Sequence, residues 1–365
     1  MGPVLLLKTV VVFAALLGVL VFVHELGHFS VARLVGMKVH EFALGFGPII
    51  ARLFKRNGTE FNIRAVPLGG FVRIAGMEPG EEEVENGFNS KSGWAKAAVV
   101  LAGPIMSLVL GYVVLIMIGY VWGFSITTTN IETVAPNSPA AEAGLRKGDA
   151  ILAINKHRLD NGYVFKNVIG KKNTGDGYLL RNIVNNSKNK KLTLLVYRDG
   201  KQLTITATPK LDKKTGRTLL GIGMTPVQKT HLGITGSTAW GTIETTRFLK
   251  DTITTIFSKR VAKEAGGIVM IGYLTSKTVE YGAQYVFFEL ALLSLTLGIL
   301  NLVPWPVLDG GHLMFIAIEG IRRKKLKPET KYAIQLGGMA VLIGLAIFLV
   351  GFDVWRIAGD KLPGP

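Results

Sequence analysis

The sequence predicts a multi-pass α-helical membrane protein with four transmembrane helices, a membrane-associated β-hairpin loop and a separate extracytoplasmic α+β domain. Four apolar runs support the membrane part, at residues 4–23, 95–121, 286–303 and 333–352. Each approaches or reaches the length of about 20 residues that a helix needs to cross a bilayer. The long segment between the second and third runs instead contains short strand-like runs separated by turn residues, which is typical of a folded domain.

The first apolar run is expected to remain in the mature protein as a transmembrane helix. It lacks the small-residue cleavage site of a signal peptide, and the polar sequence HELGH follows it directly at residues 24–28. Ionisable side chains at bilayer depth are energetically unfavourable, and by default they indicate a functional site.

HELGH is typical of a metal site. His24 and His28 are four residues apart, so on a helix both imidazoles lie on one face and can bind one ion. Glu25 projects about 100° further round the helix and can reach a water molecule at that ion. In zinc proteases with this pattern the histidines are ligands and the glutamate is the general base. Two interfacial histidines without a metal are the alternative, but that reading leaves the acid between them unexplained.

A catalytic zinc site needs a third protein ligand and one open position. The segment NLVPWPVLDGGHL offers Asp309 and His312, and the residues alone do not decide between them. Glu289 lies about five helical turns before Asp309 and is expected to be too distant. Pro304 and Pro306 are expected to distort the helix before Asp309, which can direct its carboxylate at the metal.

The loop between the first two transmembrane helices, residues 37–91, is predicted to form β-hairpins close to the membrane. In GTEFNIRA, apolar Phe61 and Ile63 alternate with polar residues, and this period of two indicates a strand. An exposed edge of such strands can pair with an extended peptide. The acidic stretch at 78–87 is interpreted as a solvated loop without a specific role.

Residues 124–228 are predicted to form the separate domain. Residues 130–156 have the pattern strand, turn, short helix, turn, strand, and residues 191–209 are typical of a hairpin with Asp199 and Gly200 in its turn. Within this region, SPAAEAGLRKGDAILAIN closely resembles part of a bacterial PDZ domain. That resemblance implies binding of an extended peptide at a sheet edge. A purely steric role, as a plug or filter over the membrane part, is the alternative.

Residues 229–280 are predicted to connect this domain to the third transmembrane helix. Trp240, Phe248 and Phe257 lie roughly on one helical face, which predicts an amphipathic helix on the membrane surface. AGGIVMIG, at 265–272, is interpreted as a glycine-rich apolar connector. The membrane part is thereby divided into two stretches, residues 1–123 and 281–365.

The charge distribution predicts the partners and the orientation. The formal net charge is +17, but aromatic residues are not interleaved with the basic ones as on a nucleic-acid-binding surface. Anionic lipid headgroups are therefore the expected partners, and nucleic acid is not expected. RRKKLK, at 322–327, predicts that the loop after the third helix is cytoplasmic, which places residues 124–228 outside and the active site toward the cytoplasm. The absence of cysteine excludes disulfides, thiolate ligands and cysteine nucleophiles.

Taken in order, these motifs resemble those of the site-2 protease family, specifically bacterial RseP-type intramembrane zinc metalloproteases. The matching stretches are HELGH, the loop GTE…PLGG, FNSKS at 88–92, and NLVPWPVLDGGHL. The last corresponds to the family pattern Asn-x-x-Pro-x-Pro-x-Leu-Asp-Gly. A single PDZ domain between the second and third helices also matches, so the resemblance spans nearly the whole chain.

The resemblance implies a zinc endopeptidase of the bacterial inner membrane that cuts single-span membrane proteins within their transmembrane segments. Anti-sigma factors and leftover signal peptides are the substrate types it suggests. It also implies that Asp309 is the third ligand and that Asn301 holds exposed substrate backbone. Gly69, Gly70 and Phe71, in the β loop, are expected to contact the unwound substrate.

Two features depart from the family pattern. Ser107, in GPIMS, stands where the family has asparagine, so a hydroxyl takes the place of the side-chain amide. The substrate contact of the family asparagine is therefore left open for this chain. The chain also has room for one PDZ domain, whereas some relatives carry two.

Two other functions fit parts of the sequence. A catalytically silent PDZ scaffold or membrane chaperone can share the same fold, and a metal transporter can share the same ligands. A transporter has no use for a general base beside its first ligand, so Glu25 favours the protease.

Overall fold

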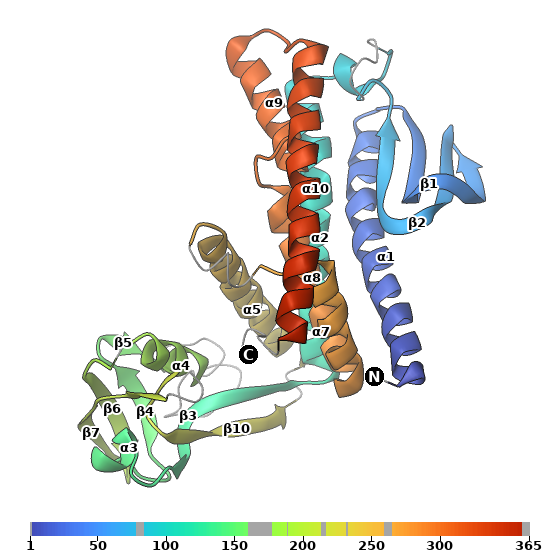
Figure 1. Cartoon of the computed structure of the whole chain (residues 1–365). Helices are drawn as coiled ribbons and strands as arrows, with labels where there is room; N and C mark the ends of the chain where they lie inside the picture. Colours follow the sequence, from blue (N-terminus) through green and yellow to red (C-terminus); the bar gives the residue numbers. More distant parts are fainter. Residues whose placement is uncertain are drawn as a thin grey trace. The chain divides into compact units, whose positions relative to one another are not determined.

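The computed structural model describes residues 2–77, 84–159, 177–187, 189–212, 217–230, 233–258 and 265–359. Most of the predicted acidic loop at 78–87 lies outside these residues. The chain forms two compact units: unit 1 comprises Met1–Leu115 and Glu244–Pro365, and unit 2 comprises Ile116–Ile243 (Figure 1).

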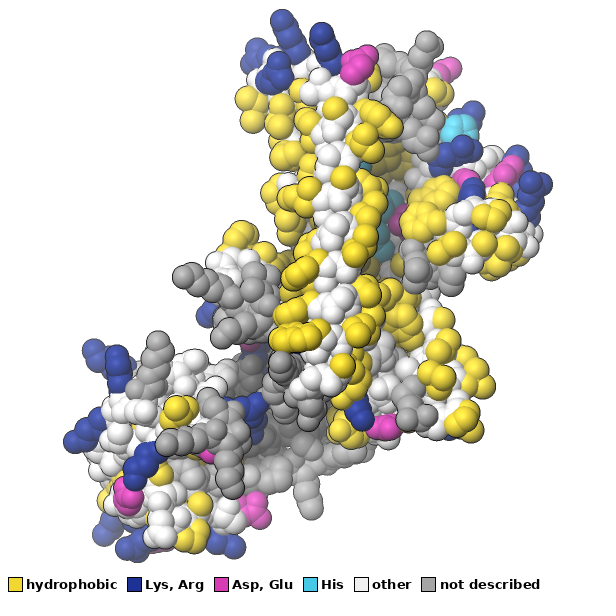
Figure 2. Space-filling view, in the orientation of Figure 1, with side chains coloured by type: hydrophobic (Ala, Val, Ile, Leu, Met, Phe, Trp, Pro, Cys, Tyr) yellow, Lys and Arg dark blue, Asp and Glu magenta, His cyan; other side chains and the backbone are white. Residues whose placement is uncertain are grey.

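Four helices are long and apolar enough to cross a membrane: α1 (Pro3–Leu34), α2 (Gly93–Val121), α8 (Ala283–Asn301) and α10 (Pro328–Ala358). The four predicted spans are thus confirmed as candidate membrane helices. Hydrophobic side chains cover the exposed side of α10 (Figure 2), as expected of a helix that faces lipid. Helix α1 extends beyond its apolar run and carries HELGH within its last turns.

Close packing of α2 against α1 and α8 depends on glycine. A Cβ at Gly27 of α1 would overlap the Ala102 carbonyl oxygen of α2. A Cβ at Gly298 of α8 would lie 2.9 Å from the Pro104 carbonyl oxygen, and one at Gly111 of α2 would lie 2.6 Å from a Leu295 side-chain carbon. Small residues allow membrane helices to approach closely, so the sequence of α2 positions its neighbours as well as spanning the membrane.

The predicted β loop is confirmed as a long hairpin of β1 (Val39–Arg56) and β2 (Thr59–Ile74), packed against α1 (Figure 1). Phe42 of β1 pairs with both Phe61 and Val72 of β2, so the first half of β1 lies between the two halves of β2. The second half of β1 pairs with the first half of β2, as at Phe54 and Phe61. The last part of β2, from Gly70 to Ile74, therefore forms an outer strand of this sheet.

A cluster of charged and polar side chains, Glu41, Asn62 and Arg64, links β1 to β2 within the hairpin. The Glu41 carboxylate accepts two hydrogen bonds from Arg64 Nη2, at 2.7 and 2.9 Å, and one from Asn62 Nδ2 at 2.8 Å. The Arg64 guanidinium also lies 5.1 Å from the centre of the Phe71 ring. Glu41 is buried, and a buried carboxylate is stable only when it is paired in this way.

Two further helices belong to unit 1: α7 (Ile268–Tyr281) and α9 (Asp309–Arg322). The interpretation of residues 265–272 as a connector is wrong from Ile268 onward, because α7 begins there. Its first turn is held by Asp353 of α10, whose Oδ2 accepts from the backbone N–H groups of Gly267 and Met270 at 2.8 and 2.9 Å. A carboxylate at a helix N-terminus satisfies amides that have no partner within the helix.

Unit 2 contains a six-stranded sheet in the order β10-β3-β4-β6-β7, with β5 beside β4. The predicted hairpin is confirmed: Arg198 pairs with Lys201, and both turn residues, Asp199 and Gly200, have positive φ. A buried apolar core joins the sheet to the helices. The elements are β3 (Phe124–Val134), α3 (Pro139–Glu142), β4 (Ala150–Ile154), β5 (His157–Arg158), α4 (Gly177–Asn185), β6 (Leu192–Arg198), β7 (Lys201–Ala207) and β10 (Ile222–Thr230).

The remaining elements are short, except for one helix that follows β10. The predicted amphipathic helix is present as α5 (Gly233–Ile256), with Trp240 buried. Its predicted place on a membrane surface stays a prediction. The short elements are η1 (Phe88–Ser90), β8 (Lys210–Asp212) and β9 (Arg217–Leu219).

Candidate active site

Three predicted side chains of unit 1 converge on one point. His24 and His28 lie one turn apart on α1, and their Nε2 atoms are 3.2 Å from each other. Asp309 Oδ2, from the first turn of α9, is 3.2 Å from His24 Nε2 and 3.4 Å from His28 Nε2. The three side chains are only 9 to 15% exposed. Residues far apart in the sequence thus form a compact group of three possible metal ligands.

The spacing of these three atoms fits zinc. Ligands at Zn–N or Zn–O distances of about 2.0–2.1 Å in tetrahedral geometry lie about 3.3 Å from one another. In addition, Asp309 Oδ2 is buried and makes no hydrogen bond among the described residues. A buried, unsatisfied carboxylate oxygen facing two imidazoles is unfavourable without a cation. The site therefore has the geometry and the unmet charge that a bound divalent ion would satisfy.

Helix α2 fixes the His28 imidazole. His28 Nδ1 lies 2.8 Å from the Val99 carbonyl oxygen, so Nδ1 carries the proton and donates it. The lone pair of Nε2 is then free for a metal. A Cβ at Gly103 would overlap the His28 ring, so the ring occupies the space that this glycine leaves open.

The second histidine also has a partner on α2. His24 Nδ1 lies 3.0 Å from the hydroxyl oxygen of Ser107, and both residues are buried. The Ser107 carbonyl oxygen in turn accepts a hydrogen bond of 2.7 Å from the Ser294 hydroxyl of α8. Ser107 therefore lies between the histidine helix and the helix that leads toward Asp309.

Asp309 is placed by the break between α8 and α9. Helix α8 ends at Asn301, and the chain is non-helical until Asp309, as the two prolines predict. A Cβ at Gly310 would overlap the Val303 carbonyl oxygen, and one at Gly311 would overlap the Trp305 carbonyl oxygen. Only glycine lets the first turn of α9 pack this closely on the break, which fixes the position of the carboxylate.

Glu25 lies between the metal group and the hairpin. It interacts electrostatically with His28, His24 and Asp309, and its carboxylate interacts with the backbone of Val72 in β2. A Cβ at Gly70 would lie 3.4 Å from Glu25 Cγ. The outer strand of the hairpin therefore runs directly past the acid that the sequence predicts as the general base.

The other predicted residues have distinct places. Asn301 is the last residue of α8 and is partly buried. Gly69 has a φ of 113°, and the Phe71 ring stacks on Phe46 with ring centres 6.2 Å apart, on the other side of the strand from Gly70. His312 is not part of the group of three possible ligands among the described residues.

Glu289 is buried at another position in unit 1. Its carboxylate oxygens lie 2.7 Å from the Thr275 hydroxyl and 2.6 Å from the Thr278 hydroxyl, both on α7. It joins α8 to α7 and is not one of the three grouped ligands. This agrees with the expectation that it lies too far from Asp309.

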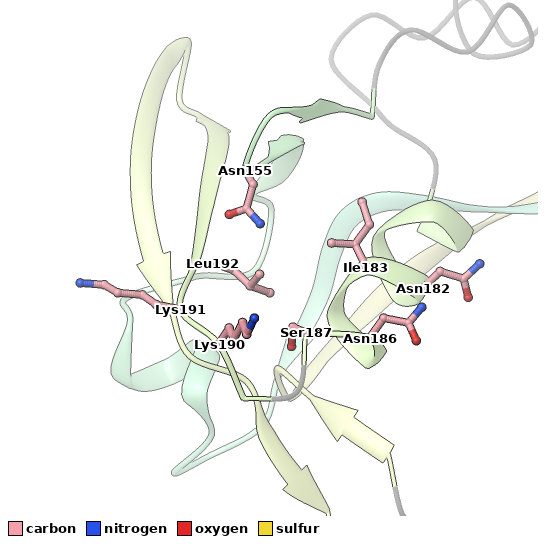
Figure 3. A pocket seen from close by; sticks show the side chains of 8 residues that line it. All are labelled: Asn155, Asn182, Ile183, Asn186, Ser187, Lys190, Lys191 and Leu192. Carbon is pink, nitrogen blue, oxygen red and sulfur yellow. The ribbon is translucent and has the colours of Figure 1, made fainter.

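Unit 2 holds a cavity of about 580 Å³ beside α4. Figure 3 shows its lining, which consists of the amides of Asn155, Asn182 and Asn186 together with Ile183, Ser187, Lys190, Lys191 and Leu192. These side chains can hydrogen-bond, but they include no carboxylate or histidine that would serve as an acid, base or metal ligand. The residues that line this cavity therefore do not form a second candidate active site.

Sequence reasoning did not identify what α2 contributes to the site. The Val99 carbonyl gives no signal in the sequence, because every residue has one. The stretch GPIMS, which contains Gly103 and Ser107, did stand out, but only because Ser107 departs from the family pattern. Both face the histidines, and their spacing of one helical turn places them on one face of α2.

Comparison with known proteins agrees with this site. Residues 12–345 match the profile of peptidase family M50. The chain is 33% identical to the Campylobacter jejuni protein named "putative zinc metalloprotease Cj1068", across 93% of this chain and 92% of that protein. It is 29% identical to the regulator of sigma-W protease RasP of Bacillus subtilis, across 96% of this chain and 99% of that protein.

A third relative is named a zinc metalloprotease. The chain is 28% identical to the zinc metalloprotease RasP of Geobacillus kaustophilus, across 96% of this chain and 98% of that protein. The family match covers both the histidines of α1 and the aspartate of α9, which the fold brings together. The chain therefore belongs to peptidase family M50, the site-2 proteases, and is a bacterial zinc metalloendopeptidase of the membrane.

Proposed function

We propose that the protein cuts single-span membrane proteins within their transmembrane segments, with His24, His28 and Asp309 as zinc ligands and Glu25 as the general base. The observation that carries the proposal is the triangle of two Nε2 atoms and one Oδ2 atom, with sides of 3.2, 3.2 and 3.4 Å, inside a group of apolar helices. Regulated proteolysis of this kind is the role that fits the family.

Different residues of the chain have different roles in the proposed peptide hydrolysis. His24, His28 and Asp309 would hold zinc, which when bound acidifies a water molecule and polarises the substrate carbonyl. Glu25, adjacent to His24, takes a proton from the attacking water and returns it to the leaving amide nitrogen. Apolar helices around the site limit the access of bulk water.

The outer strand of the hairpin is the proposed substrate site. A transmembrane helix hides its carbonyl groups in its own hydrogen bonds, so the segment to be cut must become extended. Residues Gly69, Gly70 and Phe71 lie in or next to the outer strand of β2, which passes Glu25, and an extended segment can add to that edge. Gly70 keeps the strand close to the acid. Asn301 is proposed to hold a freed backbone group through its side-chain amide.

Unit 2 is proposed to be a PDZ domain that binds an extended peptide of the substrate or filters substrates by size. Its SPAAEAGL stretch forms the short helix α3, for which the Ser138 side chain is the N-cap, accepting from the Ala141 N–H. We propose that this domain comprises residues 124–228 and lies on the extracytoplasmic side of the membrane. The loop between α9 and α10 lies at the same end of unit 1 as the C-terminal end of α1 (Figure 1), and its basic sequence RRKKLK, at 322–327, supports a cytoplasmic active-site side of the inner membrane.

The deciding experiment is Glu25→Gln in the full chain, purified in detergent or nanodiscs. We expect the variant to keep stoichiometric zinc, because Glu25 is not one of the three proposed ligands. Cleavage of a reporter transmembrane peptide should fall about 100-fold to 10,000-fold, a loss on the order of that seen for general bases. The matched control is Glu329→Gln, which neutralises an exposed glutamate at the start of α10 and should cleave normally.

Membrane proteomics of cells that carry the parent or the Glu25→Gln enzyme then identifies the substrates. Stubs of anti-sigma factors or signal peptides should accumulate with the variant. Full cleavage by Glu25→Gln would refute the assignment of the base. A parent protein that binds zinc but cuts no membrane stub would instead indicate a silent scaffold.

A further inference from the structure

The two histidines of the site are held in different ways. His28 donates from Nδ1 to a backbone carbonyl, which no substitution removes. His24 has a side-chain partner, the Ser107 hydroxyl at 3.0 Å. Ser107 is 1% exposed and His24 is 7% exposed, so water does not readily replace this contact. The orientation of one metal ligand thus depends on a single exchangeable hydroxyl.

The position of the proton on His24 defines what the Ser107 hydroxyl must do. A histidine that binds a metal through Nε2 must carry its proton on Nδ1, because the lone pair of Nε2 is used in the bond. The Nδ1–H group then needs an acceptor, since a buried N–H without one is costly. The Ser107 oxygen lies where that acceptor has to be, on the far side of the ring from Asp309 Oδ2.

Ser107 is itself held in place by the neighbouring helix. The fully buried Ser294 hydroxyl donates to the Ser107 carbonyl at 2.7 Å. Gly103 and Gly111, one turn before and one turn after Ser107, allow α2 to press against His28 and against Leu295. The backbone of α2 cannot shift at this point without losing these contacts, so the hydroxyl is presented to His24 in a fixed position.

We propose that Ser107 is a positioning residue for the metal site: its hydroxyl accepts the Nδ1 proton of His24, which selects the metal-binding tautomer and directs Nε2 at Asp309. This inference rests on the proposed zinc ligands. It also gives Ser107 a role at the metal site, in place of the substrate contact of the asparagine that the family has at this position. Partners of this kind raise metal affinity about 10-fold to 100-fold, and a neutral hydroxyl belongs at the lower end.

The test compares two buried serines of unit 1 in the full chain. Ser107→Ala removes the proposed acceptor, and Ser276→Ala removes a hydroxyl of equal size that donates within its own helix, α7, to the Tyr273 carbonyl. Zinc affinity is measured by competition with a chromophoric chelator, and thermal unfolding of the metal-free proteins reports folding. The absorption of the Co²⁺-substituted proteins reports the geometry around the metal.

We expect Ser107→Ala to bind zinc about tenfold more weakly and to change the Co²⁺ spectrum, while Ser276→Ala stays within about twofold of the parent. Ser107→Cys, which keeps the shape but is a weak acceptor, should resemble Ser107→Ala and replaces it if the alanine protein unfolds. Parent-like affinity in Ser107→Ala, or equal losses in both alanine variants, would overturn the proposal. A parent protein without stoichiometric zinc would instead overturn the proposed metal ligands themselves.

Discussion

The imidazole of His28 occupies the space in which a side chain at position 103 would lie, because a Cβ on Gly103 would overlap the ring. This relationship joins the glycine-proline motif of α2 to the metal site of α1. It gives Gly103 a reason to be glycine that is separate from helix bending, and it leads to the first prediction.

Gly103→Ala should displace the His28 ring and disable the site. A displacement of about 1 Å at a catalytic group can reduce a rate about 100-fold, and we expect at least that loss in cleavage, with weaker zinc binding. Gly18→Ala in α1 is the control, since its added Cβ meets nothing within 4 Å. Elemental analysis and a peptide-cleavage assay measure both effects. Normal zinc content in Gly103→Ala would contradict the close packing.

Metal removal separates Asp309 from His312 as the third ligand. A strong chelator should abolish cleavage, and added Zn²⁺ should restore it in the parent protein and in His312→Ala. Asp309→Ala should recover neither stoichiometric zinc nor activity, because Asp309 Oδ2 lies within 3.4 Å of the Nε2 atoms of both histidines. The reverse pattern, with zinc lost only in His312→Ala, would reassign the ligand.

Glu41→Gln should loosen the hairpin and weaken substrate binding. The substitution leaves Arg64 without its charged partner, and breaking a largely buried pair costs about 3 kcal/mol. We expect faster hydrogen exchange in residues 59–74 and a higher KM with little change in kcat. Glu60→Gln is the control, because it breaks the exposed pair with Lys55 in the same sheet. Equal effects of the two variants would show that the Glu41 cluster has no special role.

Unit 2 should lose stability in acid through Asp149. Burial opposes ionisation of this carboxyl, but hydrogen bonds from Arg198 and from the Arg146 backbone outweigh it and hold its pKa below the usual value. A lowered folded-state pKa stabilises the fold above the unfolded value of about 3.9, and this contribution is lost as the pH falls through the folded-state pKa.

Hydrogen exchange in β4 and β6 of the full chain measures this effect. Between about pH 6 and pH 3, protection in the parent should fall more steeply than in Asp149→Asn, which lacks the titrating group. The same pH dependence in both proteins would show that other groups control the acid response.

The membrane fold could be predicted from the sequence because few backbone structures satisfy their hydrogen bonds in lipid. A run of about 20 apolar residues can satisfy its backbone only as a helix, so four spans followed from composition. The hairpins of both units followed from strand alternation and from turn residues that accept positive φ, such as Asp199 and Gly200. Helix α7 was missed because its glycine-rich start resembles a linker, and its N-terminal amides are satisfied by Asp353, far along the chain.

The candidate site was only partly readable for a similar reason. The spacing of His24 and His28 is local, so it could be derived from helical geometry. The choice of Asp309 over His312 depends on how α9 packs against α1, and local pattern contains no such information; the family resemblance supplied it. The double pairing of β1, which makes Gly70–Ile74 an outer strand, likewise depends on tertiary folding that alternation cannot specify.

The break between α8 and α9 has a consequence for biosynthesis. The histidines are synthesised early, but Asp309 begins a helix that follows the third candidate span, so the ribosome makes it after most of the chain. A nascent chain that has inserted only α1 and α2 has two of the three proposed ligands and the proposed base, too few for a catalytic zinc site. We therefore expect the enzyme to stay inactive until α9 has been made, so that neighbouring membrane proteins are not cut during its insertion.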